Sequence, residues 1–242
     1  MMRKILSYSF EFNLFSKYRQ ALMGIAMLGV LILHGMSFAG IKSNVYTFPF
    51  EFFSRIAFTQ GFLFLSGLGL YYSFTKTQNV MLFYEKRIKR LMIPFMLMTL
   101  PFYLFKLIVG DSSFIRFCLE ESSLYFWLYG NNGMWYISVS LILYFLFPVL
   151  YKFMFHKENH IVLRLLVILW LYILMAVGLY FYQPDYYNLV RRGVEQSPMF
   201  VIGIFVGYLA FHKRSIKLAS LIGGVILVVV TYILYKKVNI EF

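Results

Sequence analysis

Residues 20–41 read QALMGIAMLGVLILHGMSFAGI and carry no ionisable side chain except His34. A helix of about 20 residues crosses the roughly 30 Å hydrocarbon core of a bilayer, so this stretch has the length and composition of a transmembrane helix. Further stretches of the same kind follow it, separated by short polar clusters. The sequence predicts about seven spans, near residues 20–41, 56–75, 91–109, 133–151, 165–183, 196–211 and 218–235.

The composition of the whole chain agrees with this prediction. Of 242 residues, 61% are hydrophobic and 14% are charged, and the mean hydropathy is +0.72. A water-soluble domain of this size needs more polar surface. We therefore expect an all-α fold, a polytopic transmembrane helical bundle that forms a single domain over residues 1–242. The single cysteine, Cys118, excludes an intramolecular disulfide and a metal site built from cysteines.

The net charge of +13 reflects topology rather than nucleic-acid binding, because the Lys and Arg residues fall in alternate loops and form no continuous basic face. Most of them lie on the same side as the N-terminus, so the positive-inside rule predicts a cytoplasmic N-terminus. A cleaved signal peptide ending near Ser37 and Ala39 is the alternative. The apolar stretch is longer than the usual signal-peptide core of about 7–15 residues, which favours a retained span.

His34 is a candidate functional residue because it is ionisable and lies in the outer half of the first span. Such a side chain needs a polar partner or a wet cavity, and imidazole is the commonest general base near neutral pH. The alternative role is a hydrogen bond that joins two helices. The sequence alone does not decide between a general base and a hydrogen bond between helices.

Arg87 and Arg90 are three residues apart and share one helix face where the third span begins. Two guanidinium groups there can clamp phosphate groups bidentately. A topology anchor against anionic lipid headgroups is the more ordinary interpretation. In the second span, Ser66, Gly67 and Gly69 allow either close helix packing or approach of a ligand to the backbone, and packing is the commoner use.

Polar and aromatic residues at the outer face are candidates for substrate binding. Trp135 and Tyr136 begin the fourth span, where they can belong to an interfacial aromatic belt or stack on a sugar ring. Glu195 follows Arg191 and Arg192; it can hold one of these arginines or orient His34 or a substrate hydroxyl. The four dispersed histidines form no convincing metal cluster, so we expect no metal.

Five stretches in register resemble the acyltransferase 3 family of bacterial multi-span membrane O-acyltransferases. They are MGIAMLGVLILH (23–34), FLFLSGLGL (62–70), YEKRIKRLMIPF (84–95), WYIS (135–138) and PMFVIG (198–203). The resemblance implies that His34 is catalytic and that Arg87 and Arg90 bind the donor, acetyl-CoA or another acyl-CoA. It further implies that the acceptor is a sugar or polysaccharide. It also implies that the protein lies in the plasma (inner) membrane, in contact with membrane lipid.

The sequence departs from the family pattern in two places. Met23 stands where the family has an arginine, and we expect Arg19, one turn earlier on a similar helix face, to take its place as a cofactor-binding residue. The family bundle also has more spans than this chain provides, which fits a C-terminally shortened member. An inactive relative with a structural role and a small-molecule transporter are the competing functions.

Overall fold

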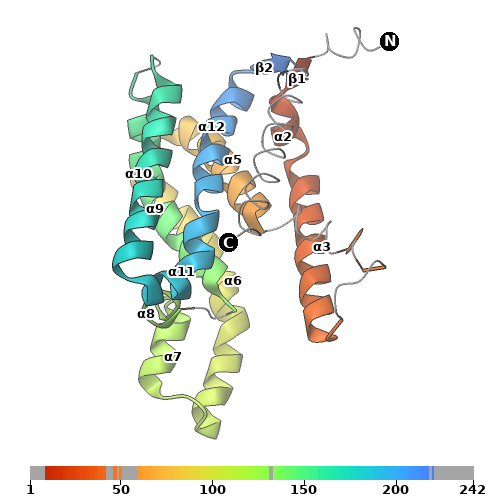
Figure 1. Cartoon of the computed structure of the whole chain (residues 1–242), viewed down its shortest axis with the longest axis vertical. Coiled ribbons are helices and arrows are strands. Elements are labelled where there is room, and N and C mark those ends of the chain that lie inside the picture. Colours follow the sequence, from red (N-terminus) through yellow and green to blue (C-terminus); the bar gives the residue numbers. More distant parts are fainter. Residues whose placement is uncertain are drawn as a thin grey trace, which may run out of the picture.

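The computed structural model describes residues 9–41, 46–47, 49–50, 59–130, 133–157, 159–217 and 220. This part of the chain forms a bundle of helices with one short pair of strands (Figure 1), which confirms the predicted all-α membrane bundle. The elements in chain order are β1 (Ser9–Glu11), α2 (Asn13–Lys17), α3 (Arg19–Phe38), α5 (Thr59–Thr77), α6 (Val80–Val109), α7 (Phe114–Glu121), α8 (Tyr125–Tyr129), α9 (Trp135–Phe155), α10 (Ile161–Tyr182), α11 (Pro184–Gln196), α12 (Pro198–Phe211) and β2 (Ser215–Lys217).

Within the described ranges, five helical stretches are long and apolar enough to cross a membrane. They are α3, α6, α9, α10 and the continuous stretch formed by α11 and α12. α5 corresponds to the second predicted span and packs against α3, α9 and α12. The seventh predicted span, residues 218–235, lies outside the described residues except for Ser220.

α6 begins at Val80, well before the third predicted span near residue 91. The Asn79 side chain caps the helix by accepting a hydrogen bond from the backbone N–H of Leu82 at 3.0 Å. The five charged residues within 85–90 do not end the helix, because their side chains are mostly exposed on its surface. The prediction from apolar composition therefore placed the start of the helix too late. α11 likewise precedes the sixth predicted span as a separate helix.

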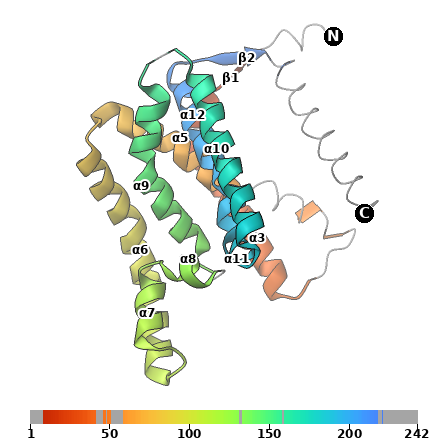
Figure 2. The same ribbon diagram turned by 60° about the vertical axis from the view of Figure 1, so that its left-hand side comes forward.

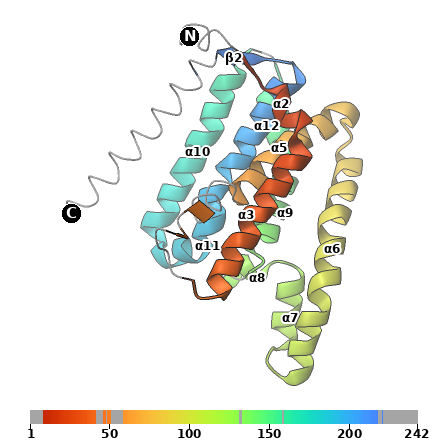
Figure 3. The ribbon, with the colours of Figure 1, turned by 90° about the vertical axis from the view of Figure 1, so that its right-hand side faces the viewer.

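The helices alternate in direction, which groups their connections at two ends of the bundle. The basic segments between α5 and α6, between α9 and α10, and after α12 lie at the end that holds β1 and β2 (Figures 1 and 2). α7, α8 and α11 lie at the opposite end (Figure 3). The prediction of a cytoplasmic N-terminus assumed that these basic segments lie at the same end of the bundle. Which end faces the cytoplasm stays a prediction.

β1 and β2 are a feature that the sequence did not predict. They pair antiparallel, with Phe10 opposite Ile216, and the backbone N–H of Phe12 donates to the carbonyl of Arg214 at 3.2 Å. The pair ties the segment before α2 to the segment after α12. It thereby closes one end of the bundle around α3, α5 and α12.

The tightest helix contact is between α5 and α12. A Cβ atom on Gly67 would meet the backbone of Phe200 and Ile204, and one on Gly203 would meet the backbone of Phe64. Two helices can approach this closely only where both present small residues. Gly67 therefore serves close helix packing, which was the commoner of the two interpretations of the Ser-Gly segment.

Two carboxyl groups of α7 are buried where this helix packs against α6, at the end away from the strands. Glu120 and Glu121 are 4% and 5% exposed, and the Arg116 guanidinium donates to Glu120 at 3.1 Å. Neither oxygen of Glu121 has a hydrogen-bond partner among the described residues. Burial raises the pKa of Glu121 above its ordinary value, and the charge of Glu120 adds to this shift.

We expect this carboxyl group to make stability depend on pH. Because the pKa is higher in the folded state, folding favours the protonated group, and stability falls as the pH rises from the unfolded pKa through the folded one. The melting temperature of the purified protein should therefore fall as the pH rises above about 4.5, the ordinary pKa of this group. Glu121→Gln should flatten this slope, whereas Asp111→Asn, at an exposed position, should leave it unchanged. Equal slopes in wild type and Glu121→Gln would refute the assignment.

Candidate active site

Arg87 is positioned by aromatic contacts between α6 and α9. The ring of Phe83 stacks on Phe147 with centroids 5.1 Å apart, and the Tyr84 hydroxyl donates to the carbonyl of Phe145 at 2.8 Å. These contacts fix the first turns of α6 against α9. Arg87 follows one turn later, half-buried, and its Nε has no acceptor among the described residues.

Arg19 is positioned by α5. Its Nε donates to the carbonyl of Leu65 at 3.0 Å, and its guanidinium lies across Gly69. A Cβ atom at position 69 would come within 2.5 Å of the guanidinium carbon, so glycine provides the space that this arginine occupies. The second glycine of the Ser-Gly segment therefore makes room for a charged side chain, in contrast to Gly67.

The two arginines lie within electrostatic range of the same side chain, Tyr144 of α9. The Tyr144 hydroxyl shares a 2.8 Å hydrogen bond with Ser66 of α5, and it lies within electrostatic range of both Arg19 and Arg87. Arg87 also lies within electrostatic range of Arg19 and Arg90. We call Arg19, Ser66, Arg87 and Tyr144 the arginine site; it draws one residue from each of α3, α5, α6 and α9.

The arginine site is strongly positive. In the part of the chain that the structure describes, no carboxylate pairs with Arg19, Arg87 or Arg90, and the nearby Glu85 pairs with Lys89 at 2.7 Å. Partly buried guanidinium groups are costly without a counter-charge, and each carries a planar set of donors that matches phosphate oxygens. The site is therefore suited to an anion with several oxygens. Arg90 is exposed, at its edge.

His34 lies at the other end of α3. Fifteen residues separate it from Arg19, a rise of about 22 Å along the helix at about 1.5 Å per residue. The two side chains differ by about 60° around the helix axis, so they project from similar sides. His34 is exposed and makes no hydrogen bond or ion pair with another described residue. It is thus an accessible imidazole separated from the arginine site by most of a span.

Of the predicted substrate-binding residues, Tyr136 lies within electrostatic range of Tyr144, two turns away on the same face of α9. Trp135 is 8% exposed and belongs to the hydrophobic core, while Tyr136 is half-buried and contacts the Phe62 ring at 6.1 Å. Glu195, on α11, holds Arg191 at 2.6 Å and accepts a hydrogen bond from Tyr187 at 3.3 Å. Of the two roles open to it, Glu195 therefore holds an arginine in this structure.

Sequence reasoning missed Tyr144. A signal was present, because Tyr136, Ser140 and Tyr144 recur every four residues and place hydroxyl groups on one face of an otherwise apolar helix. Farther along α9, Tyr151 shares a 3.1 Å hydrogen bond with Thr75 of α5. The α5–α9 contact is thus lined with hydroxyl groups over several turns.

The fold defines a multi-pass helical membrane protein, with the arginine site among α3, α5, α6 and α9. A family model described as an acyltransferase domain matches residues 20–236, and the chain belongs to this family, acyltransferase 3. The family makes the chain a membrane acyltransferase in general terms. No match to the chain was found among curated proteins or solved structures.

Proposed function

We propose that the protein transfers an acyl group, most simply acetyl, from cytoplasmic acyl-CoA to a hydroxyl group of an extracytoplasmic sugar or polysaccharide at the plasma membrane. The observation that carries this proposal is the arginine site. Arg19 and Arg87 come from distant parts of the sequence, converge near Tyr144 and have no carboxylate partner among the described residues. CoA supplies the phosphate groups that such a site binds.

The length of α3 is consistent with a donor that is bound at one end and reacts at the other. The phosphates dock at Arg19 and Arg87, with Arg90 at the exposed edge. The pantetheine arm then extends along α3 toward His34, across the rise of about 22 Å between the two residues. The thioester reaches the outer half of the membrane, and the acyl group crosses without movement of the acceptor.

In the proposed reaction, the His34 imidazole accepts the proton of the acceptor hydroxyl as its oxygen attacks the thioester carbonyl. The carbon–sulfur bond breaks, the new ester carries the acyl group, and the leaving thiolate takes the proton from imidazolium. Holding donor and acceptor together makes the attack effectively intramolecular. The proposed acceptor-side residues are Trp135 and Tyr136, at the outer end of α9, and Glu195, in the last turn of α11.

The O-acyl content of the host's surface glycan tests this proposal. A strain lacking the protein should have less O-acyl ester than the wild type, and expression of the protein should restore the content. Membrane levels of the protein must match between strains. If the strain lacking the protein had the same O-acyl content as the wild type, the surface glycan would not be the acceptor. Transport of a small molecule without acyl-CoA would favour a transporter instead.

A further inference from the structure

α7 turns its acidic residues toward the protein and its apolar residues outward. Glu120 and Glu121 are buried, whereas Phe114 and Ile115 are 67% and 72% exposed and Cys118 is also exposed. At about 3.6 residues per turn, the three exposed positions fall within about 100° of one another around the helix, and both glutamates fall outside that arc. A helix beside water has the reverse arrangement, with its apolar side buried. The side chains of α7 are therefore arranged for an apolar surrounding.

The contact between α7 and α6 is polar on both helices. α6 contributes Thr99 and Tyr103, which are buried, and Tyr103 lies within electrostatic range of Glu120 and Glu121. The Arg116 guanidinium donates to Glu120, while neither oxygen of Glu121 has a hydrogen-bond partner among the described residues. Ionisable side chains within a membrane almost always face the interior of the protein in this way.

The outward side of α7 continues an apolar surface of α6. α6 is long and apolar enough to cross a membrane, and α7 runs back beside its last turns (Figures 1 and 2). Exposed apolar side chains in this half of α6 include Leu97, Met98, Phe102, Phe105, Ile108 and Val109. One apolar surface therefore covers both helices, and the part on α6 belongs to a membrane span.

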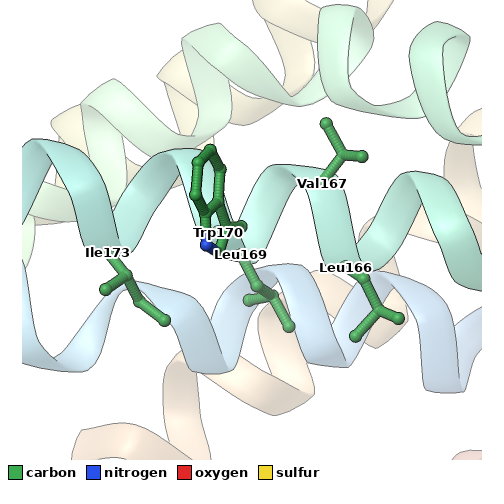
Figure 4. A pocket seen from close by; sticks show the side chains of 5 residues that line it. All are labelled: Leu166, Val167, Leu169, Trp170 and Ile173. Carbon is green, nitrogen blue, oxygen red and sulfur yellow. The ribbon is translucent and has the colours of Figure 1, made fainter.

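α10 shows what the surface of a span looks like in this protein. Its outward side has an apolar hollow of about 550 Å³, lined by Leu166, Val167, Leu169, Trp170 and Ile173 (Figure 4). Trp170 and Ile173 are 61% and 56% exposed, close to the values for Phe114 and Ile115. The outward side of α7 thus resembles that of a span, although its eight residues cover only about 12 Å.

Polar residues gather at the tip of this hairpin, where α6 turns into α7. Gly110 ends α6 in the left-handed conformation, Asp111 is exposed, and the Ser113 side chain caps α7 by accepting from the backbone N–H of Arg116 at 3.3 Å. Lys106 and Arg116 lie within about one turn of the tip, so their long side chains can reach it. The hairpin is polar at its tip and apolar behind it, as expected where the tip meets a membrane surface.

We propose that α7 is a re-entrant membrane helix. The tip, residues 110–113, lies at the membrane surface, and α7 runs back into the adjoining leaflet with Phe114, Ile115 and Cys118 against lipid acyl chains. Irregular backbone is tolerated at this depth where protein covers it. The segment after α7 fits this condition, since Ser123 and Phe126 are 3% and 0% exposed.

Cys118 is the single cysteine of the chain, so wild-type protein can be spin-labelled there alone. The protein is labelled in detergent and reconstituted into phosphatidylcholine vesicles at a high lipid-to-protein ratio, with a water-soluble nickel chelate on both sides. Electron paramagnetic resonance then compares collisions of the label with oxygen, which partitions into lipid, and with nickel. The label should collide with oxygen and be shielded from nickel, at a depth roughly 7 Å below Ser113, five residues along the helix.

Two cysteine variants in a Cys118→Ser background calibrate this measurement. Asp111→Cys, at the exposed tip, should collide with nickel, and Met98→Cys, 80% exposed on α6, should collide with oxygen. Nickel collisions at Cys118 equal to those of Asp111→Cys would place α7 in water and overturn the proposal. Shielding of Cys118 from both reagents would show that protein, such as a second copy of the chain, covers α7, and would overturn it as well.

Discussion

Gly203→Ala is expected to lower the thermal stability of the purified protein markedly. The added Cβ atom would meet the backbone of Phe64 at the closest approach of α5 and α12. Backbone cannot move aside as a flexible side chain does, so the two helices must separate along a contact that also holds Phe200 and Ile204 in the core. Overpacking of this kind costs about 1–3 kcal/mol. Loss of monodisperse protein on heating, followed by size-exclusion chromatography, measures the effect.

Gly178→Ala provides the matched control for this prediction. Gly178 lies one turn before the C-terminal end of α10, and a Cβ atom there would meet nothing within 4 Å. Alanine is favoured over glycine in helices by about 1 kcal/mol, so this variant should be at least as stable as wild type. Equal destabilisation by both substitutions would show that loss of glycine itself, rather than the α5–α12 contact, is responsible.

His34→Ala is expected to abolish most acyl transfer while leaving the fold intact. The His34 side chain is exposed and bonds to no described residue, so its removal should not change the melting temperature. Loss of a general base typically lowers the rate by about 10²–10⁴-fold. Transfer of labelled acetyl from acetyl-CoA to glycan by purified protein in nanodiscs measures the rate.

The control for this variant is His156→Ala, because His156 lies in the exposed turn after α9 at the opposite end of the bundle. It should retain full activity. A well-folded His34→Ala protein with normal transfer would remove His34 from the mechanism. An equal loss of acyl transfer in His34→Ala and His156→Ala would show that the loss is not specific to His34.

The apolar runs were sufficient to predict most of the helices, because a membrane helix must be apolar over its whole length. They did not predict the start of α6, since five of residues 85–90 are charged and a helix can continue into water with such side chains exposed. Nor did they predict α7, whose two glutamates are buried only because the helix docks against Thr99 and Tyr103. Such contacts depend on tertiary structure.

The candidate site was predictable in part. Arg87 and Arg19 were identified from helix spacing and family resemblance, and the structure places both near the same hydroxyl group. Tyr144 was not identified, because a tyrosine within an apolar span is usually a core residue. Its role depends on the approach of α3, α5 and α6 to α9, which a one-dimensional pattern does not contain. The roles of His34, Trp135 and Tyr136 stay predictions.

The most direct test of the account is the affinity of CoA for Arg87→Gln, measured by isothermal titration calorimetry on protein in lipid-free detergent. Lys89→Gln is the control, since Lys89 lies on the same helix and pairs with Glu85 in solvent. The account predicts that wild type and Lys89→Gln bind CoA equally, while Arg87→Gln binds at least about tenfold more weakly, the typical effect of losing a charged hydrogen bond. Equal affinity in all three proteins would contradict the assignment of the arginine site to the donor.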